Sequence, residues 1–204
     1  TATITVTPTY TNAGVTCTGP TTTFTITVNP TPTVNAVANL GVCNGATGTV
    51  NFSGAVSGTV YNWTNNNTAI GLGASGTGNI SFTATNAGTS PISGTINVTP
   101  TYTNAGVTCT GASITFTITV NPTPTVNAVA NQTVCNGTPT TAVTFSGVVS
   151  GTVFNWTNNT PSIGLAASGS GNIASFNAVN TGTTPVTATI TVTPTYTNAG
   201  VTCT

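Results

Sequence analysis

The stretch ITFTITV, residues 114–120, alternates strictly between apolar side chains and threonine. A period of two places every apolar side chain on one face of an extended strand, and it cannot line one face of a helix. Residues 114–120 therefore predict a β-strand with one buried face. The stretch TTFTITV at residues 22–28 differs from it at one position only, so the same strand is expected twice.

The sequence around this strand is repeated along the chain. The segment TPTYTNAGVTCT occurs at residues 7–18, 99–110 and 193–204, and residues 1–18 are identical to residues 187–204. The copies are spaced by 92 and 94 residues, so the full period of 186 residues contains two similar but unequal units. Internal repetition of this kind predicts an array of structural units stacked along one chain.

Each unit consists of short apolar stretches separated by Gly, Pro and Asn, which is typical of an all-β sandwich. In the first complete unit we expect strands at residues 34–37, 49–52, 60–63, 80–83, 92–102 and 114–120. In the second unit we expect strands at residues 126–129, 143–145, 153–156, 173–176 and 186–196. The predicted fold class is therefore all-β, with tandem β-sandwich domains in a repeat array.

Paired prolines mark the expected domain boundaries, at Asn29–Pro32 and Asn121–Pro124. Proline cannot donate to a strand ladder and stiffens a linker, so a rod of domains is predicted. Residues 1–29 would then be the last two strands of a preceding repeat, and residues 30–121 a complete domain. Residues 122–204 would form a second domain that lacks its final strand. We expect the next stretch of chain, or a neighbouring subunit, to supply that strand, because an open edge exposes the core.

Composition excludes most chemistry. The 204 residues include no Lys, Arg, Asp, Glu or His. General acid–base catalysis needs side chains that titrate near neutrality, so we expect neither an enzyme nor a cofactor. Nucleic acid is not an expected partner, because no cation can neutralise a phosphate. No apolar run approaches the roughly 20 residues of a membrane-spanning helix, so no membrane insertion is expected.

A surface without net charge favours association. We therefore expect two kinds of partner: further copies or a continuation of the same chain along a fibre, and covalent glycans. Candidate N-glycosylation sites, recognised by Asn-x-Ser/Thr, are Asn51, Asn62, Asn66, Asn79, Asn97, Asn131, Asn136, Asn155 and Asn158. The Thr-rich strand faces also offer positions for O-linked sugar.

Five cysteines, Cys17, Cys43, Cys109, Cys135 and Cys203, are disulfide candidates. One possibility pairs Cys43 with Cys109 and Cys135 with Cys203, each within a domain. The alternative pairs Cys43 of one domain with Cys203 of the next, because opposite ends of successive sandwiches meet at the joint between them. The sequence leaves both open. A metal site is not expected, since a site of cysteines alone needs about four convergent thiolates.

Four aromatic residues are expected in the cores, namely Trp63, Trp156, Tyr102 and Tyr196. Trp63 and Trp156 each follow an aromatic residue two positions earlier, so each pair shares one face of a strand. Exposed aromatic pairs could instead form a platform for carbohydrate. Core packing is the preferred interpretation.

Four segments resemble a known family. They are VCNG at residues 42–45, NWT at 62–64, YTNAGVTCTG at 102–111 and TFTITVNP at 115–122. They resemble the PKD-like, Ig-like tandem repeats of very large surface or secreted proteins of Bacteroidetes-type bacteria. The resemblance implies Ig-like sandwiches, an extracellular or cell-surface location, and roles in adhesion or stalks. The acidic motif of standard PKD domains is absent, because Thr-Asn-Asn follows both Trp63 and Trp156, so calcium is not expected.

These observations together predict a structural repeat unit of an extracellular filament, fibre or cell-surface stalk, glycosylated and stabilised by disulfides. The alternative is an adhesin or glycan-binding module of a large surface protein, in which loops such as residues 65–78 and 157–171 contact a ligand.

Overall fold

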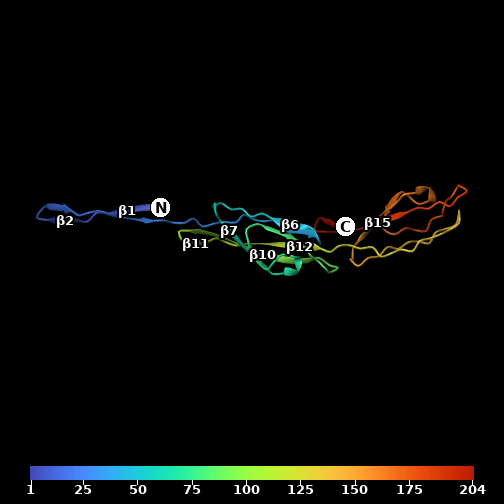
Figure 1. The fold of residues 1–204 in the computed structure, drawn as a ribbon, viewed down its shortest axis with the longest axis horizontal. Helices are drawn as coiled ribbons and strands as arrows, with labels where there is room; N and C mark the ends of the chain where they lie inside the picture. Colours follow the sequence, from blue (N-terminus) through green and yellow to red (C-terminus); the bar gives the residue numbers. More distant parts are fainter.

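The computed structural model describes residues 1–204 as an elongated, all-β chain with sixteen strands and two single-turn 3-10 helices (Figure 1). The predicted all-β class is confirmed. Three segments follow one another along the long axis. We call residues 1–29 the ribbon, residues 30–121 the central unit and residues 122–204 the C-terminal unit. Neither short helix, Thr68–Ile70 (η1) nor Pro161–Ile163 (η2), has the length or apolar content needed to span a membrane.

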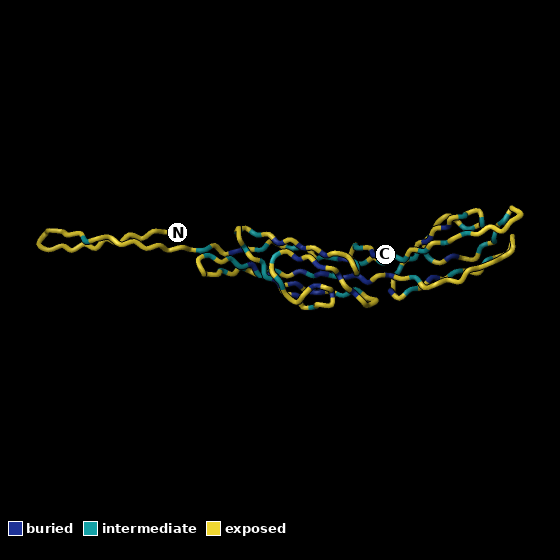
Figure 2. The backbone as a smooth tube through the Cα atoms, viewed as in Figure 1, coloured by how far each residue is buried: buried dark blue, intermediate teal, exposed yellow.

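The ribbon is a two-stranded antiparallel hairpin that extends away from the central unit. Strand β1 (Ala2–Val6) pairs with β4 (Thr22–Ile26), and β2 (Thr9–Asn12) pairs with β3 (Val15–Thr18). All four strands are exposed on both faces, as the yellow tube in Figure 2 shows. A two-stranded ribbon without a covered face has little stability of its own.

The tip of the ribbon is a tight turn that occurs three times in the chain. Ala13 and Gly14 both have positive φ, 49° and 79°. Consecutive positive φ values are typical of the two-residue turns whose twist matches antiparallel strands. The same Ala-Gly pair, with φ values within a few degrees, closes the hairpins at Ala105 and Ala199.

The central unit contains a large mixed sheet with strand order β5-β12-β10-β7-β8. Its longest strand, β10 (Ile92–Asn104), pairs with β12 (Ile114–Asn121), β7 (Val60–Asn65) and β11 (Val107–Thr110). Strand β8 (Ser75–Thr77) lies at one edge beside β7. The predicted strand at residues 114–120 is confirmed, and its apolar face is buried as expected.

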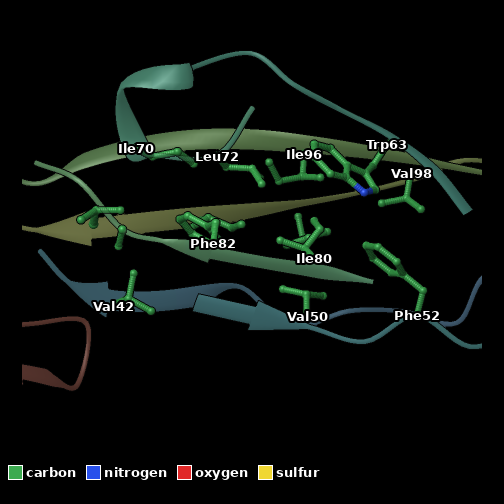
Figure 3. Packing of buried hydrophobic residues seen from close by; sticks show 14 residues of the cluster. Val42, Val50, Phe52, Trp63, Ile70, Leu72, Ile80, Phe82, Ile96 and Val98 are labelled. Atoms are coloured by element: carbon green, nitrogen blue, oxygen red, sulfur yellow. The ribbon is translucent and has the colours of Figure 1, made fainter. Parts of the chain in front are cut away.

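A second sheet of two strands, β6 (Thr47–Val50) and β9 (Ile80–Thr83), faces the large one. Fourteen buried apolar residues fill the space between them. Figure 3 shows Val50 and Ile80 of the small sheet facing Ile96 and Val98 of the large sheet. This arrangement is consistent with a β-sandwich.

The first strand of the central unit differs from the prediction. Residues 34–37 form no strand, although Val34 and Val37 pack against the core. The strand lies later, at β5 (Leu40–Cys43), and it pairs in parallel with β12. A parallel partner 78 residues away decides where this strand forms, since Ile118 pairs with Leu40. A local alternation pattern carries no information about that partner.

The C-terminal unit repeats part of this arrangement. One sheet has the order β14-β13-β15-β16, built from β13 (Val153–Asn158), β14 (Ser168–Ser170), β15 (Ile190–Asn198) and β16 (Val201–Cys203). The facing layer is reduced to two isolated bridges, Pro139 to Asn177 and Val143 to Ile173. The expected strands at residues 126–129, 143–145, 173–176 and 186–189 are therefore absent as regular strands.

Two causes account for the difference between the units. The C-terminal unit has one extra residue between Cys135 and Phe145, and Pro139 in this segment cannot donate to a ladder. It also lacks any counterpart of β12. Its core consequently holds only three buried residues, Phe145, Trp156 and Ile173, against fourteen in the central unit.

Candidate functional site

The joint between the central and C-terminal units carries a disulfide, side-chain hydrogen bonds and buried linker residues. Strand β12 ends at Asn121, and Asn121, Pro122 and Pro124 are all buried although they belong to a linker. Linkers normally run exposed to solvent. Burial of the linker at this joint indicates that the two units pack on each other across it.

A disulfide crosses the joint. Cys43, at the end of β5 in the central unit, is bonded to Cys203 in β16 of the C-terminal unit, with a Cα–Cα distance of 5.6 Å. Of the two connectivities that the sequence left open, the structure has the one between successive units. The bond joins residues 160 positions apart.

A pair of asparagines also connects the two units at the joint. The Asn198 side-chain amide donates to Asn121 Oδ1 at 2.9 Å, and Asn121 Nδ2 donates to the Asn198 carbonyl at 3.5 Å. Asn121 is 1% exposed, so this pair satisfies polar groups that water cannot reach. Asn198 lies beside the tight turn of the β15–β16 hairpin, which brings the turn onto the linker.

The β5–β6 turn also contacts the linker. The Asn44 backbone amide donates to the Asn121 carbonyl at 2.9 Å, and Asn44 Nδ2 donates to Thr123 Oγ1 at 3.1 Å. Val201 packs directly over Gly41, where a side-chain carbon would collide with it. Gly41 thus has a packing role in the joint.

The same asparagine pair occurs where the ribbon meets the central unit. Asn104 Nδ2 donates to Asn29 Oδ1 at 2.8 Å, and Asn29 Nδ2 donates to the Asn104 carbonyl at 3.5 Å. Sequence reasoning missed these four asparagines. Their recurrence at the repeat spacing, after each final strand and at each hairpin turn, was the available signal.

The remaining cysteines are not bonded. Cys17 and Cys135 are exposed, and Cys109 is half-buried. Cys17 and Cys109 occupy the position of Cys203 in their own hairpins, facing Tyr10 and Tyr102 across the ladder as Cys203 faces Tyr196. Cys135 occupies the position of Cys43.

The aromatic candidates divide into two groups. Trp63 and Trp156 are buried in the cores, and each ring lies over a glycine of the neighbouring strand, Gly76 and Gly169 respectively. Trp156 Nε1 donates to the Gly171 carbonyl at 3.2 Å, whereas Trp63 Nε1 is buried without a partner. Tyr102 and Tyr196 are half-buried on the hairpins, outside both cores.

The glycosylation candidates differ in accessibility. Asn158 is buried, and its amide donates to the carbonyls of Leu165 and Ala166. Asn62 is half-buried and donates to Thr101 Oγ1. The other seven are exposed, and they are Asn51, Asn66, Asn79, Asn97, Asn131, Asn136 and Asn155.

A shallow hollow of about 450 Å³ lies over β8, β7 and β10. Its lining is mostly polar, with Asn62, Thr64, Asn97 and Thr99 among the contributors. The one aromatic residue beside it, Trp63, is 9% exposed, so its ring face is not available for stacking against a sugar. The loops at residues 65–78 and 157–171, to which the adhesin alternative assigns ligand contact, are tied to the sheets by the buried side chains of Asn65 and Asn158.

No protein-family model matches the chain, and no curated protein matches it. The function is therefore inferred mainly from the geometry of the joint. The joint is made of side-chain amides, a hydroxyl, prolines and one disulfide. These groups can hold one unit in a fixed position against the next.

Proposed function

We propose that the chain is a structural repeat unit of an extracellular filament, fibre or cell-surface stalk. The observation that carries the proposal is the Cys43–Cys203 disulfide between successive units. A disulfide within a unit stabilises that unit, whereas this bond fixes the relation between two units. A protein whose covalent cross-link lies at the joint is suited to keep its shape along an axis.

Two further observations support this role. The two asparagine pairs give the ribbon joint and the joint between the units the same hydrogen bonds, so one geometry recurs along the axis. The segments also follow one another in an elongated arrangement (Figure 1). Disulfides persist in oxidising environments, which favours a location outside the cytosol.

Glycans are part of the proposal, because an uncharged surface needs another source of solubility. The exposed candidates Asn51, Asn97 and Asn131 make no side-chain hydrogen bonds within the chain, so sugar could be attached without breaking any. Intact-mass measurement of the natural protein, before and after enzymatic deglycosylation, tests this part. A mass equal to that of the bare polypeptide would remove it.

The experiment for the structural role is immunogold labelling of intact cells that make the protein. Antibodies are raised against the folded 204-residue chain, and the same antibodies absorbed with that chain serve as the control. We expect gold particles along thin filaments or stalks outside the cell. Labelling confined to the cell interior, or spread over soluble material only, would contradict the proposal.

A further inference from the structure

The C-terminal unit has an open position where the central unit has β12. In the central unit, β12 pairs with residues 92–98 on one side and with β5 on the other. The counterparts in the C-terminal unit are residues 186–192 and residues 132–135, and neither has a partner on the side facing this position. Val134 is 41% exposed, whereas its counterpart Val42 is 8% exposed.

Polar groups around the open position also lack the partners that β12 provides. In the central unit, Asn39 Oδ1 accepts from the Thr117 amide and Asn86 Nδ2 donates to the Val120 carbonyl. Their counterparts are Asn131, which makes no side-chain hydrogen bond, and Asn180, whose Nδ2 donates only to the Thr184 carbonyl. The C-terminal unit thus keeps the donors and acceptors for a strand that it does not contain.

The ribbon carries a strand of the required sequence. Residues 23–29, TFTITVN, are identical to residues 115–121 of β12. Phe24 is 51% exposed and Val28 is 83% exposed, whereas their counterparts Phe116 and Val120 are 3% and 0% exposed. Apolar side chains in this number on a two-stranded ribbon indicate a surface that is buried in another state.

Strand β4 can exchange its partner strand without losing hydrogen bonds. Strand β4 pairs with β1 in the same register in which β12 pairs with β10, since Ile4 faces Phe24 and Ile96 faces Phe116. Residues 1–6 are identical to residues 187–192 at one flank of the open position. Every hydrogen bond that β4 makes with β1 can therefore be remade with residues 187–192.

We propose that the open position binds β4 of a second copy of this chain, which leaves β1 and pairs with residues 187–192, so that copies join end to end. The exchange adds a parallel ladder to residues 132–135 and buries the apolar face of β4, neither of which the ribbon has alone. The donor's residues 1–18 stay outside, since the acceptor already holds that sequence at residues 187–204. The proposal rests on the structural role proposed above and gives it a partner.

The joint between the two copies would have the same arrangement as the joint between the central and C-terminal units. Asn29 and the prolines after it lead from β4 to the donor's central unit, just as Asn121 leads from β12 to the C-terminal unit. By this equivalence, Cys135 of the acceptor takes the place of Cys43, and Cys109 of the donor takes the place of Cys203. The exchange thus brings together two of the three free thiols.

These two thiols can then be oxidised by a small-molecule disulfide such as oxidised glutathione. Cys135 and Cys109 each lose a proton, and an S–S bond forms between them. The S–S bond of the oxidant is broken, and it accepts the electron pair and the two protons to leave as two thiols. Cys17, which lies in the displaced part of the ribbon, stays free.

The first test measures association without covalent links, in Cys17→Ser/Cys109→Ser/Cys135→Ser chains that keep the Cys43–Cys203 bond. Light scattering after size exclusion should show a mass that rises with concentration. Phe24→Asp should weaken association by about 100-fold, because it places a carboxylate in the core that β4 enters. The matched variant Val15→Asp adds the same charge to an exposed position of the ribbon and should associate like the parent.

A peptide of residues 19–29 gives a second measurement that leaves the ribbon unchanged. It should compete with β4 and reduce the mass to that of one chain, whereas the same peptide with Asp in place of Phe24 should not. A parent chain that stays monomeric at every concentration, or Phe24→Asp association equal to the parent's, would overturn the proposal.

The second test places the cross-link. In a glutathione redox buffer the chain with all its cysteines should give a ladder on non-reducing gels. Cys109→Ser and Cys135→Ser should each abolish the ladder, and Cys17→Ser should keep it. A ladder that persists in Cys109→Ser or Cys135→Ser would overturn the proposed joint. A monomeric chain would overturn the exchange but not the structural role, since immunogold labelling of the natural protein tests that role separately.

Discussion

At the scale of single residues, the three Ala-Gly turns have a backbone conformation that alanine adopts poorly. Ala105 has a φ of 47°, in the left-handed region, where an L-residue with a Cβ atom loses about 1–2 kcal/mol. Asparagine tolerates this region better and is common at the first position of such turns. The turns are therefore not optimised for stability.

We expect Ala105→Asn to raise the free energy of unfolding of the central unit by about 0.5–1 kcal/mol. Urea denaturation followed by fluorescence measures it. Ala112→Asn, at an exposed position where φ is negative, is the matched control and should have no effect. Equal midpoints for Ala105→Asn, Ala112→Asn and the parent would contradict this interpretation of the turn.

At the scale of elements, the two units have similar sequences but differ by one strand, which the C-terminal unit lacks. The central unit buries Phe116, Ile118 and Val120 of β12 at the centre of its core, and the C-terminal unit has nothing in their place. Burying one large apolar side chain stabilises a fold by about 1.5–3 kcal/mol. The C-terminal unit should therefore be the less stable of the two.

The two tryptophans allow this difference to be measured, since each unit contains one. A Trp63→Phe chain reports on the C-terminal unit through Trp156, and a Trp156→Phe chain reports on the central unit through Trp63. In each case the reporting unit keeps its natural core. We expect the Trp156 transition at a lower urea concentration than the Trp63 transition. Coincident transitions would show that the open position does not weaken the unit.

Sequence reasoning succeeded for strands in which apolar and polar side chains alternate clearly. The strands at Ile80–Thr83 and Ile114–Asn121 follow from alternation alone. It failed for β5 and for residues 186–189, because whether these segments form strands depends on β12. Strand β5 has β12 beside it, and residues 186–189 have no such neighbour. For the joint, the positions of the cysteines suggested a disulfide between successive units but could not exclude disulfides within each unit. The asparagine pairs depend on two linkers meeting two hairpins, which no local pattern shows.

At the scale of the whole molecule, the absence of Asp, Glu and His predicts a free energy of unfolding that does not change between pH 5 and pH 7. The slope of the free energy of unfolding with pH is set by the difference in bound protons between the unfolded and native chains. The chain contains none of the side chains that ordinarily gain or lose a proton between pH 5 and pH 7. Between pH 5 and pH 7 the slope should therefore be zero.

This expectation is tested by thermal denaturation between pH 5 and pH 7, at low and at high sodium chloride concentration. The midpoint should not move with pH, and a charge-screening effect of the salt should be absent as well. Sodium sulfate is the positive control, since it strengthens apolar burial without acting on charges and should raise the midpoint. A midpoint that shifts with pH across this range would contradict the prediction.

The bond between Cys43 and Cys203 also determines which part of the chain carries a pulling force. A force applied to the two ends runs along residues 1–43, across the sulfur atoms and out through residues 203–204, so residues 44–202 bear none of it. Single-molecule stretching should bring the oxidised chain to an end-to-end length of about 160 Å, against about 710 Å after reduction. A single chain pulled by its two termini would therefore keep most of its folded residues free of tension.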